Sequence, residues 1–167
     1  MTPEEITEMR VLVAKARART LTLEERGRFE LAFTALEQSL KRAQLLLAPR
    51  GAMSRRSFRV VCELDADLVL NGVRHRSRTQ NFSLGGFAAL LAEQPAPGAR
   101  VPFALWFSPE GPPLEGVAVC RASLPQDGRW RGCFEFADLT EEAAARLKLE
   151  VLDVALEMLW PSTSLES

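Results

Sequence analysis

Two hydrophobic periodicities divide the chain into an N-terminal helical part and a longer part made of strands. From residue 2 to residue 48, apolar residues recur three or four positions apart, the spacing of one helix face. The first series is Ile6, Met9, Val13 and Ala16, and the second is Phe29, Ala32, Phe33, Leu36, Leu40, Ala43 and Leu47. Thr-x-x-Glu capping boxes at Thr2 and Thr22 begin the two segments. The pattern predicts an antiparallel α-helical hairpin over 1–48.

From Phe58 onward the period changes to the alternation of strands that bury one face. The even-numbered residues from Phe58 to Leu68 are apolar, and the Asn71-Gly72 dipeptide after them signals a two-residue hairpin. Further strands are predicted over 73–79, 87–91, 100–107, 116–124 and 130–136, separated by Pro- and Gly-containing turns. These short strands predict an antiparallel barrel or sandwich, followed by a capped helix that ends at Trp160-Pro161.

The helical and strand-forming parts meet at one clear linker. Pro49-Arg50-Gly51 cannot continue a helix, so residues 49–57 are predicted to join the hairpin to a barrel with its C-terminal helix over 58–160. Residues 161–167 are predicted to be a disordered tail. The apolar stripes of the hairpin either pack on each other or on the barrel, or form a dimer interface. Both alternatives stay open, because a lone two-helix hairpin leaves much apolar surface uncovered.

Composition narrows the function classes. The formal net charge is −1, so no global field favours nucleic acid or an anionic membrane, and any basic site must be local. The sequence has no apolar run of membrane-spanning length, and its acidic start is unlike a signal peptide. Dispersed Cys62, Cys120 and Cys133 are typical of free thiols in a reducing cytoplasm. With His75 as the single histidine, we expect a cytoplasmic protein that has neither a metal nor a cofactor.

Two short motifs lie at informative places. Arg55-Arg56-Ser57-Phe58-Arg59 is an RxxxR pattern in the linker, and Asn81-Phe82-Ser83-Leu84-Gly85-Gly86 is an (D/N)xSxxG pattern just before the third strand. In this order, over roughly residues 54–150, they resemble the PilZ family. The resemblance implies a six-stranded antiparallel barrel with a C-terminal helix, here preceded by the helical hairpin, and a receptor for the second messenger cyclic di-GMP.

The resemblance also implies which residues contact the ligand. The candidate cyclic di-GMP contacts are Arg55, Arg59, Asn81, Ser83 and Gly86, and Arg56 inside the first motif is added to them. Independently of the family, guanidinium groups bind the O6 and N7 atoms of guanine in bidentate fashion, stack on bases and pair with phosphate. A side-chain amide and a hydroxyl add partners at a base edge. A glycine permits close approach of backbone and ligand, or a turn with positive φ.

The family pattern is not matched in full. Asn81 replaces the more frequent Asp, and Ser54 stands where many relatives have a further arginine, which leaves the number of bound nucleotides open. The arginines of the first motif are also compatible with a solvated charge run, and the second motif with a simple turn. Phe87 and Trp106 are predicted to belong to the barrel core rather than to stack on bases.

The function predicted from the sequence is that of a bacterial receptor that changes conformation on binding cyclic di-GMP and signals to a partner protein, in processes such as motility. Self-association through the N-terminal helices is a further possibility. The alternatives are a PilZ-like interaction module without nucleotide and a nucleic-acid-binding barrel, the latter suggested by the alternating Arg74, Arg76 and Arg78. Catalysis is not expected, because Ser83 has no recognisable base partner and no paired-carboxylate motif is present.

Overall fold

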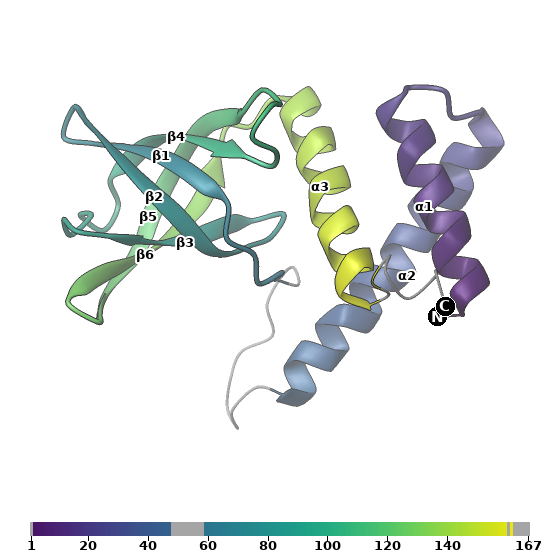
Figure 1. The fold of residues 1–167 in the computed structure, drawn as a ribbon, viewed down its shortest axis with the longest axis horizontal. Coiled ribbons are helices and arrows are strands. Elements are labelled where there is room, and N and C mark those ends of the chain that lie inside the picture. Colours follow the sequence, from purple (N-terminus) through teal and green to yellow (C-terminus); the bar gives the residue numbers. More distant parts are fainter. Residues whose placement is uncertain (1, 48–58, 160, 162–167) are drawn as a thin grey trace. The chain divides into compact units, whose positions relative to one another are not determined.

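The computed structural model describes residues 2–47, 59–159 and 161 (Figure 1). The chain divides into two compact units. One unit is Arg59–Leu147, and the other combines Met1–Phe58 with Lys148–Ser167. The boundary between the units therefore falls inside the C-terminal helix as well as at the linker.

Six strands form the first unit, as predicted. They are β1 (Asp65–Leu70), β2 (Val73–Phe82), β3 (Gly86–Leu91), β4 (Arg100–Trp106), β5 (Leu114–Gln126) and β6 (Arg129–Ala137). All neighbouring strands are antiparallel, and they close into a barrel in the order β1-β2-β3-β6-β5-β4 (Figure 1). Of the two folds predicted from the strand pattern, the structure is therefore the barrel and not the sandwich.

Tight turns fix the register of two of the strand pairs. Asn71 and Gly72 have φ angles of 51° and 77° and connect β1 to β2, and Asp127-Gly128 connects β5 to β6 with φ angles of 50° and 76°. Positive φ at both central residues suits the twist of a two-residue hairpin. The prediction at Asn71-Gly72 is confirmed.

The first strand begins later than its alternation predicts. Regular pairing of β1 starts at Asp65, and in the described chain before it Val60 forms an isolated bridge to Phe82. A side chain replaces part of the ladder, because the Thr79 hydroxyl donates to the Cys62 carbonyl at 2.7 Å and accepts from the Leu64 N–H at 2.9 Å. The apolar alternation nevertheless holds, since Val60, Leu64, Ala66 and Leu68 are all buried.

An aromatic cluster occupies the barrel interior. Phe87 lies 5.1 Å from Phe134, 5.5 Å from Phe103 and 5.7 Å from Phe136 between ring centroids, and only 1% of its surface is exposed. Phe87 is therefore a core residue, as predicted. Trp106 is not, because the alternation along β4 turns it outward to a half-buried position.

Three helices build the second unit: α1 (Pro3–Arg17), α2 (Leu23–Leu47) and the later part of α3 (Glu141–Leu159). The predicted hairpin of α1 and α2 is confirmed, and capping boxes hold the first residues of both helices. Its apolar faces are buried together with the face of α3. The buried residues of this unit are Ile6, Met9, Leu12, Val13, Phe29, Phe33, Leu36, Val151, Leu152, Ala155 and Leu156.

Ion pairs at the edges of this apolar core connect the same three helices. Arg17 on α1 pairs with Glu150 at 2.7 Å and with Asp153, both on α3, while Lys148 on α3 pairs with Glu30 on α2 at 2.7 Å. Such exposed pairs add little stability each, but they indicate how the polar edges of the helices face one another. None of the helices in the described part of the chain is long and apolar enough to cross a membrane.

Candidate functional site

The second sequence motif spans the end of β2 and the turn into β3. Phe82 points into the core and is fully buried, which leaves its neighbour Asn81 on the outer side. The backbone N–H of Ser83 donates to the Gly86 carbonyl at 2.8 Å and closes the turn. The Ser83 hydroxyl accepts from the Gly85 N–H at 3.1 Å and lies 3.4 Å from the Gly86 carbonyl. The turn therefore uses the hydroxyl for its own stability, and 4% of Ser83 is exposed.

Gly86 is needed for a reason that its sequence context does not show. Of the two roles considered for Gly86, a turn with positive φ does not apply, because its φ is not positive. A Cβ atom at this position would instead lie 1.9 Å from the Phe134 carbonyl oxygen and 3.1 Å from the Glu135 Cα. The absence of a side chain thus permits the backbones of β3 and β6 to approach at the first pair of their ladder, Gly86 with Glu135.

The end of the first motif is attached directly to the second. Val60 and Phe82 exchange backbone hydrogen bonds of 2.9 and 3.0 Å, which brings Arg59 beside the end of β2. The Arg59 Nη1 atom donates to the Asn81 Oδ1 atom at 2.9 Å, and the contact is partly buried. Two residues predicted independently from separate motifs, 22 positions apart, are therefore in contact.

The structure places four of the six predicted ligand contacts in one region: Arg59, Asn81, Ser83 and Gly86. Arg55 and Arg56 lie outside the described residues. The sequence pattern does not single out Val61, which is on the same face as Arg59 and is 76% exposed. The alternation from Phe58 predicts that its neighbour Val60 is buried, and the bridge to Phe82 confirms it.

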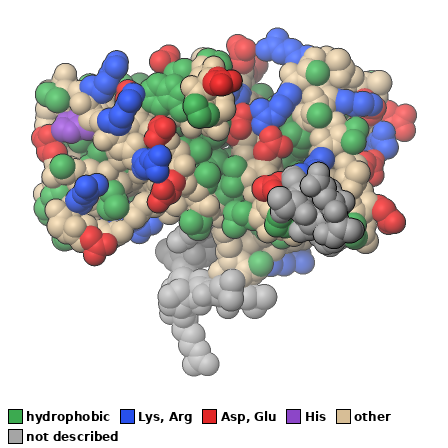
Figure 2. All heavy atoms as spheres, in the orientation of Figure 1, with side chains coloured by type: hydrophobic (Ala, Val, Ile, Leu, Met, Phe, Trp, Pro, Cys, Tyr) green, Lys and Arg blue, Asp and Glu red, His purple; other side chains and the backbone are tan. Residues whose placement is uncertain are grey.

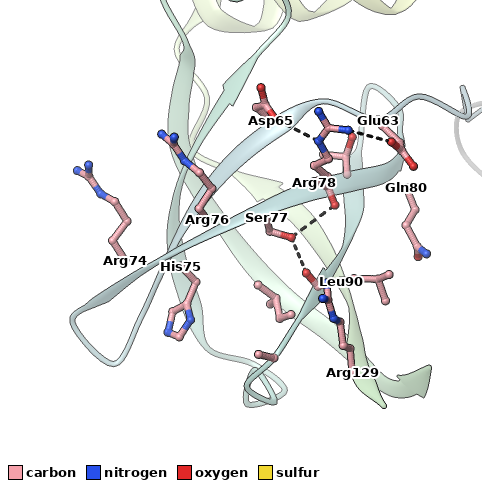
Figure 3. A pocket seen from close by; sticks show the side chains of 13 residues that line it. Glu63, Asp65, Arg74, His75, Arg76, Ser77, Arg78, Gln80, Leu90 and Arg129 are labelled. Atoms are coloured by element: carbon pink, nitrogen blue, oxygen red, sulfur yellow. Dashed lines mark hydrogen bonds and ion pairs between the residues drawn. The ribbon is translucent and has the colours of Figure 1, made fainter. Parts of the chain in front are cut away.

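The row of arginines on β2 lies on the outer face of the barrel, as its alternation indicates. Arg74, Arg76 and Arg78 are exposed (Figure 3). Arg76 is 3.1 Å from Asp67 and Arg74 is 3.8 Å from it, while Arg78 pairs with carboxylates of Asp65 and Glu63, each at 3.3 Å.

The hydrogen bond to Asp67 raises the pKa of Arg76, and the Arg76 guanidinium lies 5.9 Å from the Trp106 ring centre. Basic and acidic side chains accordingly lie next to one another over this face of the barrel (Figure 2). Carboxylates pair with all three arginines of the row and offset their positive charge. The row is therefore a poor binding surface for a polyanion such as a nucleic acid.

The described residues offer little for metal or thiol chemistry. Among them, no three His, Cys, Asp or Glu side chains are grouped as a metal site requires. The three cysteines are free thiols, and burial raises the pKa of the Cys120 and Cys62 thiols. A raised pKa reduces the thiolate fraction, so these two residues are poor nucleophiles.

The sequence of this chain matches the model of the PilZ domain over residues 53–152. The chain belongs to the PilZ family. The match covers both motifs, all six strands and the first part of α3, whereas α1 and α2 lie outside it. The resemblance inferred from the two motifs is thereby confirmed.

Solved PilZ structures share the fold. The Escherichia coli YcgR protein in complex with c-di-GMP has 20% identity and a TM-score of 0.59, covering 68% of this chain and 51% of YcgR. The separate PilZ domain of YcgR with c-di-GMP has 19% identity and a TM-score of 0.55, covering 69% of this chain and all of that domain.

The Bacillus subtilis inhibitor of motility MotI (DgrA) has 20% identity and a TM-score of 0.54, covering 66% of this chain and 56% of MotI. The matched region thus spans about half the length of YcgR and of MotI. No curated protein matches the sequence significantly.

Proposed function

We propose that this PilZ protein is a receptor for cyclic di-GMP that changes conformation on binding and signals to a partner protein. The contact between Arg59 and Asn81 carries the proposal, because it joins the two motifs at one place on the barrel surface. The structures of YcgR with c-di-GMP support the choice of ligand, and the description of MotI as an inhibitor of motility makes motility the process we expect.

The chemistry of the paired side chains suits a guanine nucleotide. The 2.9 Å bond uses one N–H of the Arg59 guanidinium and one lone pair of the Asn81 amide oxygen, which holds both side chains in a fixed orientation. A guanidinium held by its edge presents a flat face to a base, and the Asn81 amide nitrogen is a donor for an acceptor on guanine. Exposed Val61 beside them supplies apolar contact area for the ligand.

We further propose that the ligand draws Arg55 and Arg59 together around it, beside Asn81 and Ser83. The segment between α2 and Val60 connects the helical unit to the barrel. Closing this segment around the ligand would therefore alter the surface to which a partner protein binds. The ligand can drive this change only if the closed form binds it better than the open form. We expect Arg56, which stands between the two motif arginines in the sequence, to pair with a phosphate.

Calorimetric titration of cyclic di-GMP into the full chain tests the proposal, with GTP as the control ligand. We expect saturable binding, and Arg59→Ala and Asn81→Ala should each weaken it by about 5- to 150-fold, the worth of a good guanine contact. Arg55→Ala should behave similarly. Arg100→Ala is the matched control, because Arg100 is exposed and β4 is the strand farthest from β3 around the barrel.

The outcomes separate the candidate functions. Binding that is unaffected by Arg59→Ala would refute the proposed site, and an absence of binding with intact folding would make the chain an interaction module that does not use the nucleotide. The conformational step is tested by small-angle scattering and limited proteolysis around Arg50 with saturating ligand. Unchanged scattering together with unchanged cleavage would exclude it.

A further inference from the structure

In the described part of the chain, one backbone edge of the first half of β2 has no strand partner. On its other side β2 pairs with β1, and the Thr79 N–H donates to the Leu64 carbonyl at 2.9 Å. Successive residues of a strand direct their backbone groups to alternate sides, so residues 75 and 77 also face β1. The N–H and C=O groups of Arg74 and Arg76 therefore face away from β1, toward β3.

The strand β3 does not pair with this edge. The β2–β3 ladder runs from Phe82 with Phe87 to Thr79 with Ala89 and ends there, directly after an irregularity between Asn81 and Thr79. The remaining residues of β3 pair with β6 on the opposite side. A hydrogen bond from the Ser77 hydroxyl to the Leu90 carbonyl is the last described link between the two strands. Beyond it, toward Val73, the two strands separate.

A pocket of about 790 Å³ occupies the place where the ladder is missing (Figure 3). Arg74, Arg76, Arg78 and His75 line it from β2, Leu90 from β3 and Arg129 from the start of β6. Glu63 and Asp65 are the carboxylates in its lining. Arginine side chains thus reach the pocket from both β2 and β6. The three on β2 are paired with Asp67, Asp65 or Glu63, whereas Arg129 has no ion pair among the described residues.

We propose that this edge of β2 is a docking site for an extended, acidic segment of a partner protein, which adds a strand beside Arg74 and Arg76. Main-chain hydrogen bonds to the two residues would hold the segment, and the surrounding arginines would select for acidic side chains. The carboxylate of Asp67 already orients Arg74 and Arg76, and each guanidinium has five N–H donors, so a second carboxylate can join the same group.

Charge argues against a second copy of the chain as the occupant. Pairing two β2 edges would bring the arginine rows of both copies together, and like charges on adjacent strands are destabilising. The alternative to a docking site is that the charged side chains on this edge bind no partner and only prevent strand pairing and aggregation. The test must therefore distinguish an acidic partner strand from an edge that binds nothing and from a site for any polyanion.

The probe is a fluorescein-labelled peptide of about eight residues that alternates glutamate with valine, a length typical of strands. Its anisotropy is measured with the full chain at moderate salt. The comparison probes are the same peptide with alternate backbone nitrogens methylated and an oligothymidine of equal length. We expect saturable binding of the first peptide and a loss of about tenfold or more on methylation, because methylation removes main-chain donors without changing charge.

Protein variants locate the contact. Arg76→Pro removes an N–H that does not belong to the β1 ladder and should abolish binding. Because proline can disturb the fold, the double variant Arg74→Gln/Arg129→Gln is measured as well and should weaken binding by about tenfold through charge alone. Arg100→Gln, on the strand farthest from β3, should leave binding unchanged.

Three results would overturn the proposal. They are equal binding of the methylated peptide, tighter binding of the oligothymidine, and no binding of any probe to the folded protein. Hydrogen exchange followed by NMR tests the premise separately. In the free protein the amides of Arg74 and Arg76 should exchange faster than those of His75 and Ser77, and exchange that is equally slow at all four would show that the edge is paired.

Discussion

Replacement of Gly86 by alanine tests whether this motif residue is needed for packing of the barrel or for ligand contact. The added Cβ would lie 1.9 Å from the Phe134 carbonyl oxygen and 2.9 Å from the carbonyl carbon. Both atoms belong to the backbone of the neighbouring strand, so no side-chain rotation relieves the overlap. Strand β3 or β6 must therefore move by roughly 1.5 Å, since non-bonded contacts of a carbon atom are normally about 3.5 Å.

The cost follows from what this movement disturbs. The adjacent pair is Phe87 with Phe134, whose stacked rings lie at the centre of the aromatic cluster. Overpacking of a well-packed core costs about 1–3 kcal/mol. Loss of the hydrogen bonds from the Phe136 N–H to the Gly85 carbonyl and across the Ser83 turn adds about 1 kcal/mol each. Gly86→Ala should therefore lower the free energy of unfolding of the barrel by about 3–5 kcal/mol.

Urea unfolding followed by tryptophan fluorescence measures this effect, because Trp106 and Trp130 both lie in the barrel. Gly27→Ala is the control of opposite sign, followed by far-UV circular dichroism. Gly27 lies in α2 with no atom within 4 Å of an added Cβ, so alanine should stabilise the helix by about 0.5–1 kcal/mol. If Gly86→Ala is as stable as the wild type yet loses cyclic di-GMP binding, the packing argument is wrong and Gly86 contacts the ligand.

Three further predictions concern single side chains. Thr79→Val removes the hydroxyl that bonds two backbone groups and should cost about 1–3 kcal/mol in urea unfolding, whereas an unchanged midpoint would contradict that role. The hydrogen bond from Lys15 lowers the pKa of Glu25, so the stabilisation is present above the ordinary glutamate pKa of about 4.3 and is lost as pH falls through the lowered value. Glu25→Gln should therefore flatten the acid dependence of helical unfolding by circular dichroism, and an identical pH profile would refute this. Burial raises the pKa of Cys120, so mass spectrometry should find it alkylated by iodoacetamide much more slowly in the folded than in the unfolded protein, and equal rates would contradict its burial.

Much of the architecture could be predicted because it depends on interactions between neighbours in the sequence. A helical or alternating period shows which face of an element is buried, and a dipeptide such as Asn71-Gly72 carries the positive φ angles of its turn in its own residue types. The two motifs likewise indicate the family, since they depend on residue identity and spacing alone. The six-stranded barrel and the helical hairpin followed from these signals.

Only the tertiary structure shows what each buried face packs against. The stripes of α1 and α2 are buried together with the later part of α3, which comes from more than 100 residues farther along the chain. The requirement for Gly86 comes from the backbone of β6, and the pairing of the β2 arginines comes from carboxylates of β1 and the residues just before it. The type of each of these residues does not indicate which residue it contacts in the folded protein.

The same distinction applies to the candidate site. The sequence by itself determined that Arg59 and Asn81 belong to two separate motifs, because residue type and spacing are local properties. Their contact required the bridge between Val60 and Phe82, which depends on where the chain before β1 meets the end of β2. Hydrophobic periodicity indicates which positions are buried away from water. Which residue each of them contacts depends on how the whole barrel closes.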